Sequence, residues 1–236
     1  MIKMVVSSFY NTLINQEEAI PTSTMLEIER IRKKNILFSV CTNRHYKEVL
    51  EYNNDFPFID YIISLNGSYI YDVNKKRCIS KKKISNSILK KMDLLFPEYK
   101  KIYYTETDIK ESWKETDTIP IYKIEIEIPE WEDSIKNKIE KIKLNYSILE
   151  KDNKTFLEIT SPKSNMFFGV DQISLKNEIN LKDIVVIGSN DSDYSLIQNI
   201  KNSYITKNSS PRLKKITKRV TNSNNDKGVE KIIRKI

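Results

Sequence analysis

The chain has 236 residues, a length that corresponds to one or two ordinary domains. Hydrophobic residues make up 39% of it and charged residues 31%, which is typical of a folded globular protein and excludes a disordered chain. No apolar run approaches the roughly 18 residues that a membrane-spanning helix needs, so we expect no membrane segment. The first residues form a short apolar run without a signal-peptide cleavage site, which predicts a first strand.

Cysteine and histidine are too scarce for several classes of site. Cys41 and Cys78 are the only cysteines, which excludes a disulfide framework and a cysteine-rich zinc site. His45 is the only histidine, so a multi-histidine metal centre is excluded and any histidine-dependent triad would have to use it. This cysteine usage predicts a reduced, cytoplasmic protein.

The formal net charge of +8 raises the question of an anionic partner. Basic proteins are attracted to nucleic acid and anionic lipid through phosphate neutralisation. Lysine and arginine occur along the whole chain among aspartate and glutamate, which favours solvated surface charges over a nucleic-acid site. We therefore expect no nucleic-acid partner, and nucleic-acid binding through the middle segment is the third-ranked alternative.

The predicted elements alternate between strand and helix at both ends of the chain. The predicted strands are residues 2–8, 36–41, 59–64, 68–72, 77–80, 101–105, 121–128, 146–149, 155–160, 183–187 and 203–206. The predicted helices begin near residues 21, 45, 84, 131, 169 and 193, and two more lie near the C-terminus. Hydroxyl side chains at residues 22–24 are available as N-caps for the first helix, and Asn35 suits a left-handed C-cap.

These patterns predict an α/β fold with an inserted α+β domain. Strand–helix alternation up to about residue 83 favours a Rossmann-like parallel sheet with right-handed crossovers. Residues 121–128 alternate strictly between apolar and charged, which favours an antiparallel strand with one wet face. Residues 1–82 and 165–236 are therefore predicted to form the core, and residues 83–164 a separate domain. Only four glycines occur, and we expect each where a positive φ or close backbone approach excludes a side chain.

Polar motifs follow the predicted strands where a parallel sheet carries its ligand site. They are Ser-Phe-Tyr-Asn-Thr-Leu at 8–13, Thr-Asn-Arg at 42–44, Asn-Gly-Ser at 66–68, Gly-Ser-Asn-Asp-Ser-Asp at 188–193 and Asn-Asp-Lys-Gly-Val at 225–229. In this order and spacing they resemble the motifs of the haloacid dehalogenase superfamily, in its Cof-type branch of sugar- and nucleotide-phosphate phosphatases. The resemblance covers the whole chain and implies that residues 83–164 form an α/β cap.

The same resemblance implies that the catalytic groups have been replaced. In the family an aspartate attacks phosphorus and a second aspartate, two residues later, protonates the leaving oxygen; Ser8 and Tyr10 occupy these positions here. The family lysine corresponds to Phe168. The family's Mg²⁺ is held at the positions of Ser8 and Ser189, and only Asp193 keeps its identity. We therefore predict an inactive enzyme and expect neither Mg²⁺ nor any other cofactor.

Other positions leave two interpretations open. Thr42, with Asn43, is a candidate phosphate-binding group, but its hydroxyl also suits the end of a buried strand. Asp193 is either a vestigial metal ligand or the N-cap of the next helix. Lys163 is a candidate replacement for the lost lysine. Tyr10 fills space that metal and substrate occupy in the family.

The function predicted from these residues is a phosphatase-fold protein that has lost catalysis and serves as a binding or structural module. The first alternative is an active phosphatase on small phosphorylated metabolites with a rebuilt site. A small phosphorylated molecule or inorganic phosphate, bound weakly, and a protein are the predicted partners. Helix N-termini and concave groups of backbone N–H donors attract anions without a metal.

Overall fold

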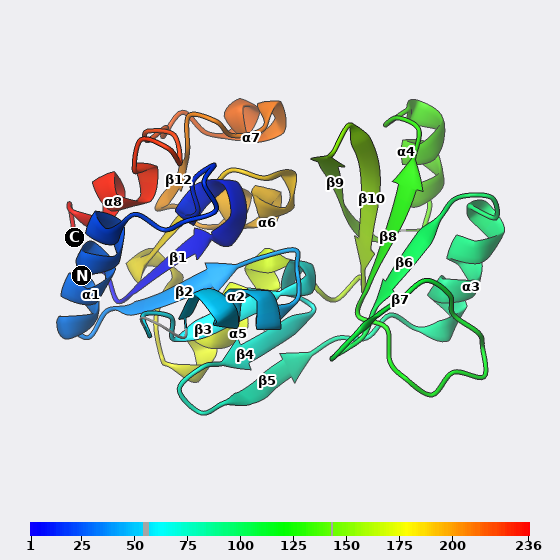
Figure 1. Ribbon diagram of the computed structural model, residues 1–236, viewed down its shortest axis with the longest axis horizontal. Coiled ribbons are helices and arrows are strands. Elements are labelled where there is room, and N and C mark those ends of the chain that lie inside the picture. Colours follow the sequence, from blue (N-terminus) through cyan, green and yellow to red (C-terminus); the bar gives the residue numbers. More distant parts are fainter. Residues whose placement is uncertain (54–56, 143) are drawn as a thin grey trace.

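The computed structural model describes residues 1–53, 57–142 and 144–236 and consists of a core and a cap (Figure 1). The core contains a seven-stranded sheet in the order β12-β11-β1-β2-β3-β4-β5, in which the first five strands are parallel, β4 pairs antiparallel with β3, and β5 pairs antiparallel with β4. The strands are β1 (Met4–Ser8), β2 (Leu37–Cys41), β3 (Tyr61–Ser64), β4 (Tyr69–Asp72), β5 (Arg77–Lys81), β11 (Ile184–Gly188) and β12 (Ser203–Ile205).

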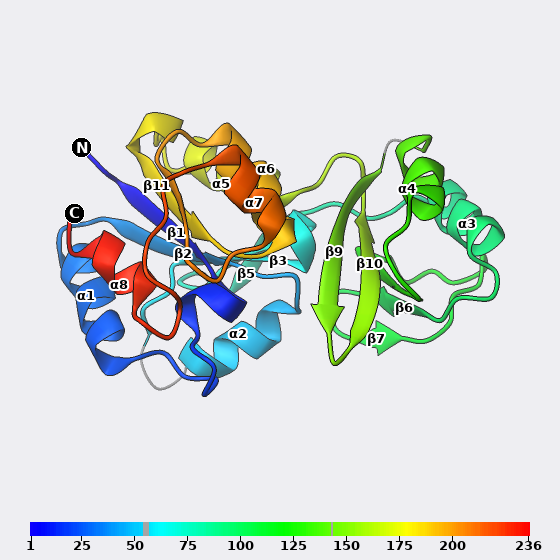
Figure 2. The same ribbon diagram turned by 90° about the horizontal axis from the view of Figure 1, so that it is seen from above.

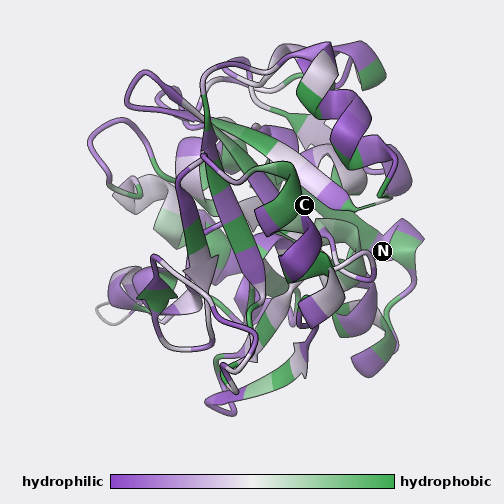
Figure 3. Ribbon diagram, turned by 90° about the vertical axis from the view of Figure 1, so that its right-hand side faces the viewer, coloured by the Kyte–Doolittle hydropathy of each residue, from purple (hydrophilic) through white to green (hydrophobic). Residues whose placement is uncertain are grey.

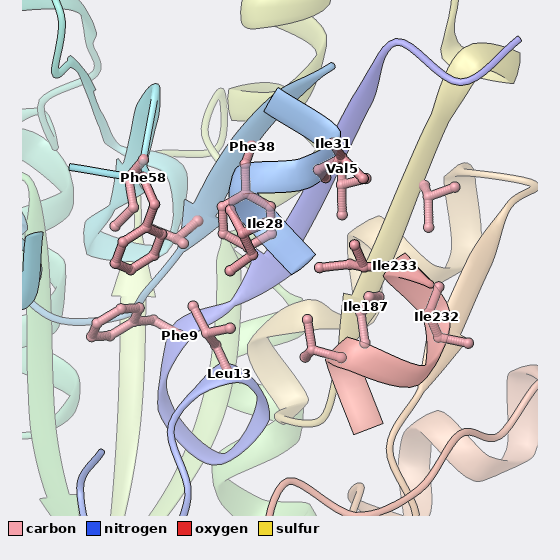
Figure 4. Packing of buried hydrophobic residues seen from close by; sticks show 14 of the residues in the cluster. Val5, Phe9, Leu13, Ile28, Ile31, Phe38, Phe58, Ile187, Ile232 and Ile233 are labelled. Atoms are coloured by element: carbon pink, nitrogen blue, oxygen red, sulfur yellow. The ribbon is translucent and has the colours of Figure 1, made fainter. Parts of the chain in front are cut away.

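Helices cover both faces of this sheet. They are α1 (Thr22–Lys33), α2 (Tyr46–Asn53), α5 (Met166–Lys176), α6 (Tyr194–Asn199), α7 (Pro211–Ile216) and α8 (Gly228–Ile233), with short 3₁₀ turns at Leu65–Gly67, Leu181–Asp183 and Asp191–Asp193. Side chains of α1 and α8 (Figure 4) and of α2 pack on one face, and those of α5, α6 and α7 pack on the other. Among the described residues no helix is both long and apolar enough to cross a membrane.

The predicted fold class is confirmed, although the first helix begins differently from the prediction. Pro21 precedes α1, and no hydroxyl side chain caps its N-terminus. The hydroxyls of Ser23 and Thr24 instead donate to Glu230 of α8, at 2.7 and 3.2 Å. They therefore connect two distant parts of the chain, a role that local sequence does not reveal. Asn35 has a φ of 60°, as its place after the helix predicted.

The cap is a five-stranded antiparallel sheet with two helices on its outer face (Figure 2). Its strand order is β7-β6-β8-β10-β9. The elements are α3 (Asn86–Leu95), β6 (Lys101–Tyr104), β7 (Ile109–Lys110), β8 (Lys123–Ile128), α4 (Asp133–Glu140), β9 (Asn145–Lys151) and β10 (Lys154–Thr160). The sequence did not predict β7. The domain boundaries at residues 82 and 165 stay a prediction.

The prediction of a wet face on β8 is wrong. Figure 3, viewed from the cap side, shows hydrophilic and hydrophobic residues alternating along strands of the cap. The charged side of β8 is nevertheless buried, because Lys123 has no exposed surface and Glu125 is only 8% exposed. This side faces the core, so the charged residues of β8 line the junction between cap and core.

Candidate functional site

The candidate site lies at the carboxyl edge of the parallel strands, which points toward the cap (Figure 1). β1 ends at Ser8, β2 at Cys41 and β11 at Gly188, and the loops that follow them meet at this edge. Phe9, directly after β1, is fully buried in the core cluster (Figure 4). It anchors the loop, and the next residue, Tyr10, borders the space under the cap.

Asp193, the retained acidic residue, is fully buried, and both of its carboxylate oxygens accept hydrogen bonds from the protein. Oδ1 accepts a short hydrogen bond from the Ser8 hydroxyl, and Oδ2 accepts the backbone N–H groups of Ser189 and Asn190 at 2.8 and 2.9 Å. Burial raises the pKa of Asp193, and these three donors offset part of that rise. Gly188 makes the arrangement possible, since a Cβ there would lie 2.8 Å from Oδ2. The carboxylate bonds the backbone preceding its turn and does not cap α6.

The donor set at the position where the resemblance implies a metal does not fit Mg²⁺. The hydroxyls of Thr12 and Ser189 hydrogen-bond each other at 2.7 Å, and the Ser8 hydroxyl donates a hydrogen bond to Asp193. Mg²⁺ requires near-octahedral oxygen coordination that normally includes carboxylates with free lone pairs. Across the described residues, no group of three His, Cys, Asp or Glu side chains is placed to hold a metal ion.

Tyr10, at the position to which the resemblance assigns the general acid, is poorly suited to that chemistry. Its ring packs edge-on against Phe9, with centroids 5.2 Å apart, and the Arg44 guanidinium lies 3.8 Å from the ring centroid. Burial raises the pKa of Tyr10 to about 12, although Arg44 opposes the shift. A phenol with this pKa holds its proton far too tightly to protonate a leaving oxygen near neutral pH.

The predicted phosphate-binding residues are engaged by other parts of the protein. The Thr42 hydroxyl accepts the Arg44 backbone N–H at 3.0 Å, an arrangement typical of a turn after a strand. The Asn43 amide donates to Glu158 of the cap at 2.8 Å, and its carbonyl accepts from Lys123 at 2.7 Å. An anion beside Asn43 would therefore meet a carboxylate.

Of the two candidate positions for the family lysine, Phe168 carries no ammonium group and Lys163 is exposed. Phe168 lies in the first turn of α5, where its N–H donates to the Asn165 side chain at 2.8 Å. Its ring lies 5.3 Å from the Lys82 ammonium. Lys163 is exposed in the segment before α5, as expected of a solvated lysine rather than a site residue.

Sequence reasoning missed a buried charge cluster, the Lys123 cluster, formed by Lys123, Glu125 and Glu158. The Lys123 ammonium contacts Glu125 at 2.5 Å and Glu158 at 3.1 Å, and lies 3.9 Å from the Tyr104 ring centroid. Glu158 also accepts the Asn66 amide of the core at 3.0 Å. Burial disfavours both charges, yet the glutamates hold the pKa of Lys123 above its usual range, and Lys123 holds that of Glu158 below it. The only sequence signal for this cluster is the strict alternation of apolar and charged residues at 121–128.

A second polar contact joins cap and core around Glu106. Its carboxylate accepts from Tyr69 at 3.0 Å and from Lys81 at 2.7 Å, both in the core sheet. Its carbonyl contacts Nε2 of His45 at 2.5 Å. Burial lowers the pKa of His45, so the histidine supports this junction in its neutral form.

A cavity of about 610 Å³ lies between the two parts. Neither Ser8 nor Asp193 lines it. Its wall combines polar, aromatic and charged side chains from the core and the cap, including Tyr10, Asn43, Arg44, Asn190, Tyr104, Glu125, Phe156 and Glu158. The cavity has the size and mixed lining of a small-molecule site.

Comparison with known sequences confirms the resemblance. The sequence profile of the haloacid dehalogenase-like hydrolases matches residues 10–108 and 97–233. A protein of Buchnera aphidicola named "Putative phosphatase" is 32% identical over 94 residues, which is 39% of this chain and 35% of that protein. The aligned segment thus spans about a third of that relative's length.

Solved structures share the whole fold at low sequence identity. A haloacid dehalogenase-like hydrolase from B. subtilis superposes with a TM-score of 0.85 at 14% identity, covering 99% of both chains. A structure described as a subclass IIB sugar phosphatase gives 0.83 at 19% identity, covering 99% of this chain and 98% of its own. A Thermotoga maritima protein gives 0.77 at 19% identity, with coverages of 100% and 98%.

Proposed function

Because this chain belongs to the haloacid dehalogenase-like hydrolase family and its strand-end site is closed by internal hydrogen bonds, we propose that it is a phosphatase-fold binding module without phosphatase activity. The observation that carries the proposal is the hydrogen bonding and burial of the Asp193 carboxylate. Both of its oxygens serve protein donors and its side chain is fully buried. The one acidic group left in the family motif is thus a structural group.

The chemistry of the remaining residues supports the same conclusion. A phosphoryl acceptor must reach the substrate, but Ser8 is 2% exposed and lies outside the cavity wall. The leaving oxygen needs a proton donor with a pKa near neutrality, and the pKa of Tyr10 is about 12. No metal step is available from this donor set.

The proposed ligand site is the cavity between core and cap. The wall holds two cations, Arg44 and Lys151. Arg44 has the planar guanidinium that suits a phosphate group, although it also pairs with Glu48 at 3.3 Å, so a small phosphorylated molecule or inorganic phosphate is the first ligand to test. Five glutamates, Glu125 and Glu158 among them, lie in the same wall and oppose an anion, and the Asn43 amide already serves Glu158. We therefore expect weak phosphate binding, in the millimolar range. Glu158→Gln, which removes one of these charges, should strengthen it.

An active phosphatase with a rebuilt site is the second candidate, and the Ser8–Asp193 hydrogen bond favours it. A hydroxyl group that donates a hydrogen bond to a carboxylate has the arrangement of an activated nucleophile. The Buchnera relative's name points to the same activity.

A phosphatase screen separates the two functions. Purified protein is assayed on a panel of sugar and nucleotide phosphates with Mg²⁺ and with EDTA, beside Ser8→Ala and the matched variant Ser7→Ala. Ser7 is a buried serine on the same strand whose hydroxyl donates only to the Ser8 carbonyl. We expect background rates in all samples. Turnover that Ser8→Ala abolishes and Ser7→Ala retains would establish the rebuilt site instead.

A further inference from the structure

The positive charge of the protein is concentrated in one segment. Residues 194–225 contain seven lysines and arginines and no aspartate or glutamate, so they carry +7 of the net +8. The rest of the chain has 33 basic and 32 acidic residues. The expectation of evenly interleaved charges therefore fails for this segment. A general enrichment in lysine would raise the charge everywhere, so it does not account for the segregation.

The fold places these cations around the β12 end of the core sheet: on the segments that flank β12, on α7 and on the segment after α7. All seven are exposed: Lys201, Lys207, Arg212, Lys214, Lys215, Lys218 and Arg219, which we call the basic edge. β12 is the outermost strand, with Lys201 before it and Lys207 after it.

The chain after α7 returns to this strand. Val220 bridges Ile205 in parallel, and the Arg219 guanidinium donates to the Lys201 carbonyl at 2.8 Å. These contacts bring Arg219 next to the segment that carries Lys201. Figures 1 and 2 show α7 and α6 on the same side of the core.

Most of the basic edge lacks charge compensation. Within the described ranges, Arg212 is its one member in an ion pair, with Asp191 at 2.8 Å. The phosphates of a polyanion neutralise such exposed cations, and the release of the polyanion's condensed counterions favours the binding.

We propose that the basic edge binds nucleic acid through its phosphate backbone. An anionic membrane is a poorer fit, because membrane-surface helices insert an apolar face. α7 has only six residues and its Leu213 is fully buried in the core. Ile216 and Val220, at 37% and 51% exposed, are isolated among polar neighbours. The binding surface lies on the core and is separate from the cavity, so it goes beyond the function proposed above.

Two matched quadruple variants test the proposal. The first changes the exposed lysines of the basic edge to glutamine at 201, 214, 215 and 218. The second makes the same change at four exposed lysines elsewhere, at 75, 76, 83 and 91. Both lose the same net charge. Binding of a short fluorescent single-stranded RNA is followed by anisotropy between about 50 and 200 mM salt, and phosphatidylserine vesicles serve as a second probe.

We expect the unmodified protein to bind RNA with a strongly salt-dependent affinity. The basic-edge variant should lose at least about tenfold in affinity. The magnitude of its slope of log K against log salt should decrease by about 3, since the four lost phosphate contacts each contribute about 0.7. The matched variant should change less than about threefold. Equal losses in both variants, no RNA binding, or binding to vesicles but not RNA would each overturn the proposal. Circular dichroism confirms that both variants fold.

Discussion

Replacing Lys123 with methionine tests how strongly the Lys123 cluster stabilises the junction between cap and core. The Lys123 ammonium contacts Glu125 and Glu158 and donates to the Asn43 carbonyl. Methionine keeps most of the side-chain volume but leaves two carboxylates, 10% and 2% exposed, without their cation. Breaking a buried pair in this way costs about 3–5 kcal/mol. We therefore expect Lys123→Met to lower the free energy of unfolding by about 4 kcal/mol, and the urea midpoint by more than about 1 M.

An exposed pair on the same sheet provides the matched control. Lys154 contacts Glu127 at 2.7 Å, but their side chains are 55% and 30% exposed. Solvent screens such a pair, so Lys154→Met should cost less than about 1 kcal/mol. Adding Glu158→Gln to Lys123→Met should recover part of the loss, because it removes one uncompensated charge. Equal, small losses in Lys123→Met and Lys154→Met would refute the reasoning.

Three further predictions concern stability and are measured by urea denaturation. Gly188→Ala should cost about 1–3 kcal/mol, since its Cβ would lie 2.8 Å from Asp193; an unchanged midpoint would contradict this. Ser8→Ala should cost about 1.5–3 kcal/mol, the usual contribution of a hydrogen bond to a charged group; a stabilised variant would contradict it. Lys123 and neighbouring donors hold the pKa of Glu158 in the folded protein below its usual 4.5. The ionised Glu158 side chain therefore stabilises the fold fully above pH 4.5, and this stabilisation is lost as the pH falls through the folded-state pKa. The stability gap between the unmodified protein and Glu158→Gln should therefore narrow as the pH falls from neutral to below 4.5; a gap that stays constant down to acid unfolding would show that Glu158 is not linked in this way.

The core was predictable because its strands are continuous apolar runs between turn signals. Residues 2–8 and 36–41 contain β1 and β2, and residues 183–187 contain all of β11 except Gly188; the three strands lie side by side in the sheet. The polar motifs at the strand ends could be located because the sequence shows where these apolar runs end. All four glycines occupy positions where a Cβ would meet another atom at less than 3 Å, as their scarcity predicted.

The junction between cap and core was not predictable from local patterns. Lys123 and Glu125 have the alternation of a solvated strand face, and only the tertiary arrangement places that face against the core. The partners of Asn43 and Asp193 likewise come from residues far away or from the backbone. Sequence identifies which side chains are present at a strand end, but not which of them are already hydrogen-bonded.

A calorimetric Mg²⁺ titration tests the central claim, loss of the metal-dependent site, most directly. The unmodified protein is compared with a variant that restores two family carboxylates, Ser8→Asp combined with Ser189→Asp. The account predicts no binding heat for the unmodified protein at millimolar Mg²⁺, because both oxygens of Asp193 already accept hydrogen bonds. It predicts measurable affinity in the restored variant. Saturable Mg²⁺ binding by the unmodified protein that Asp193→Asn abolishes would contradict it.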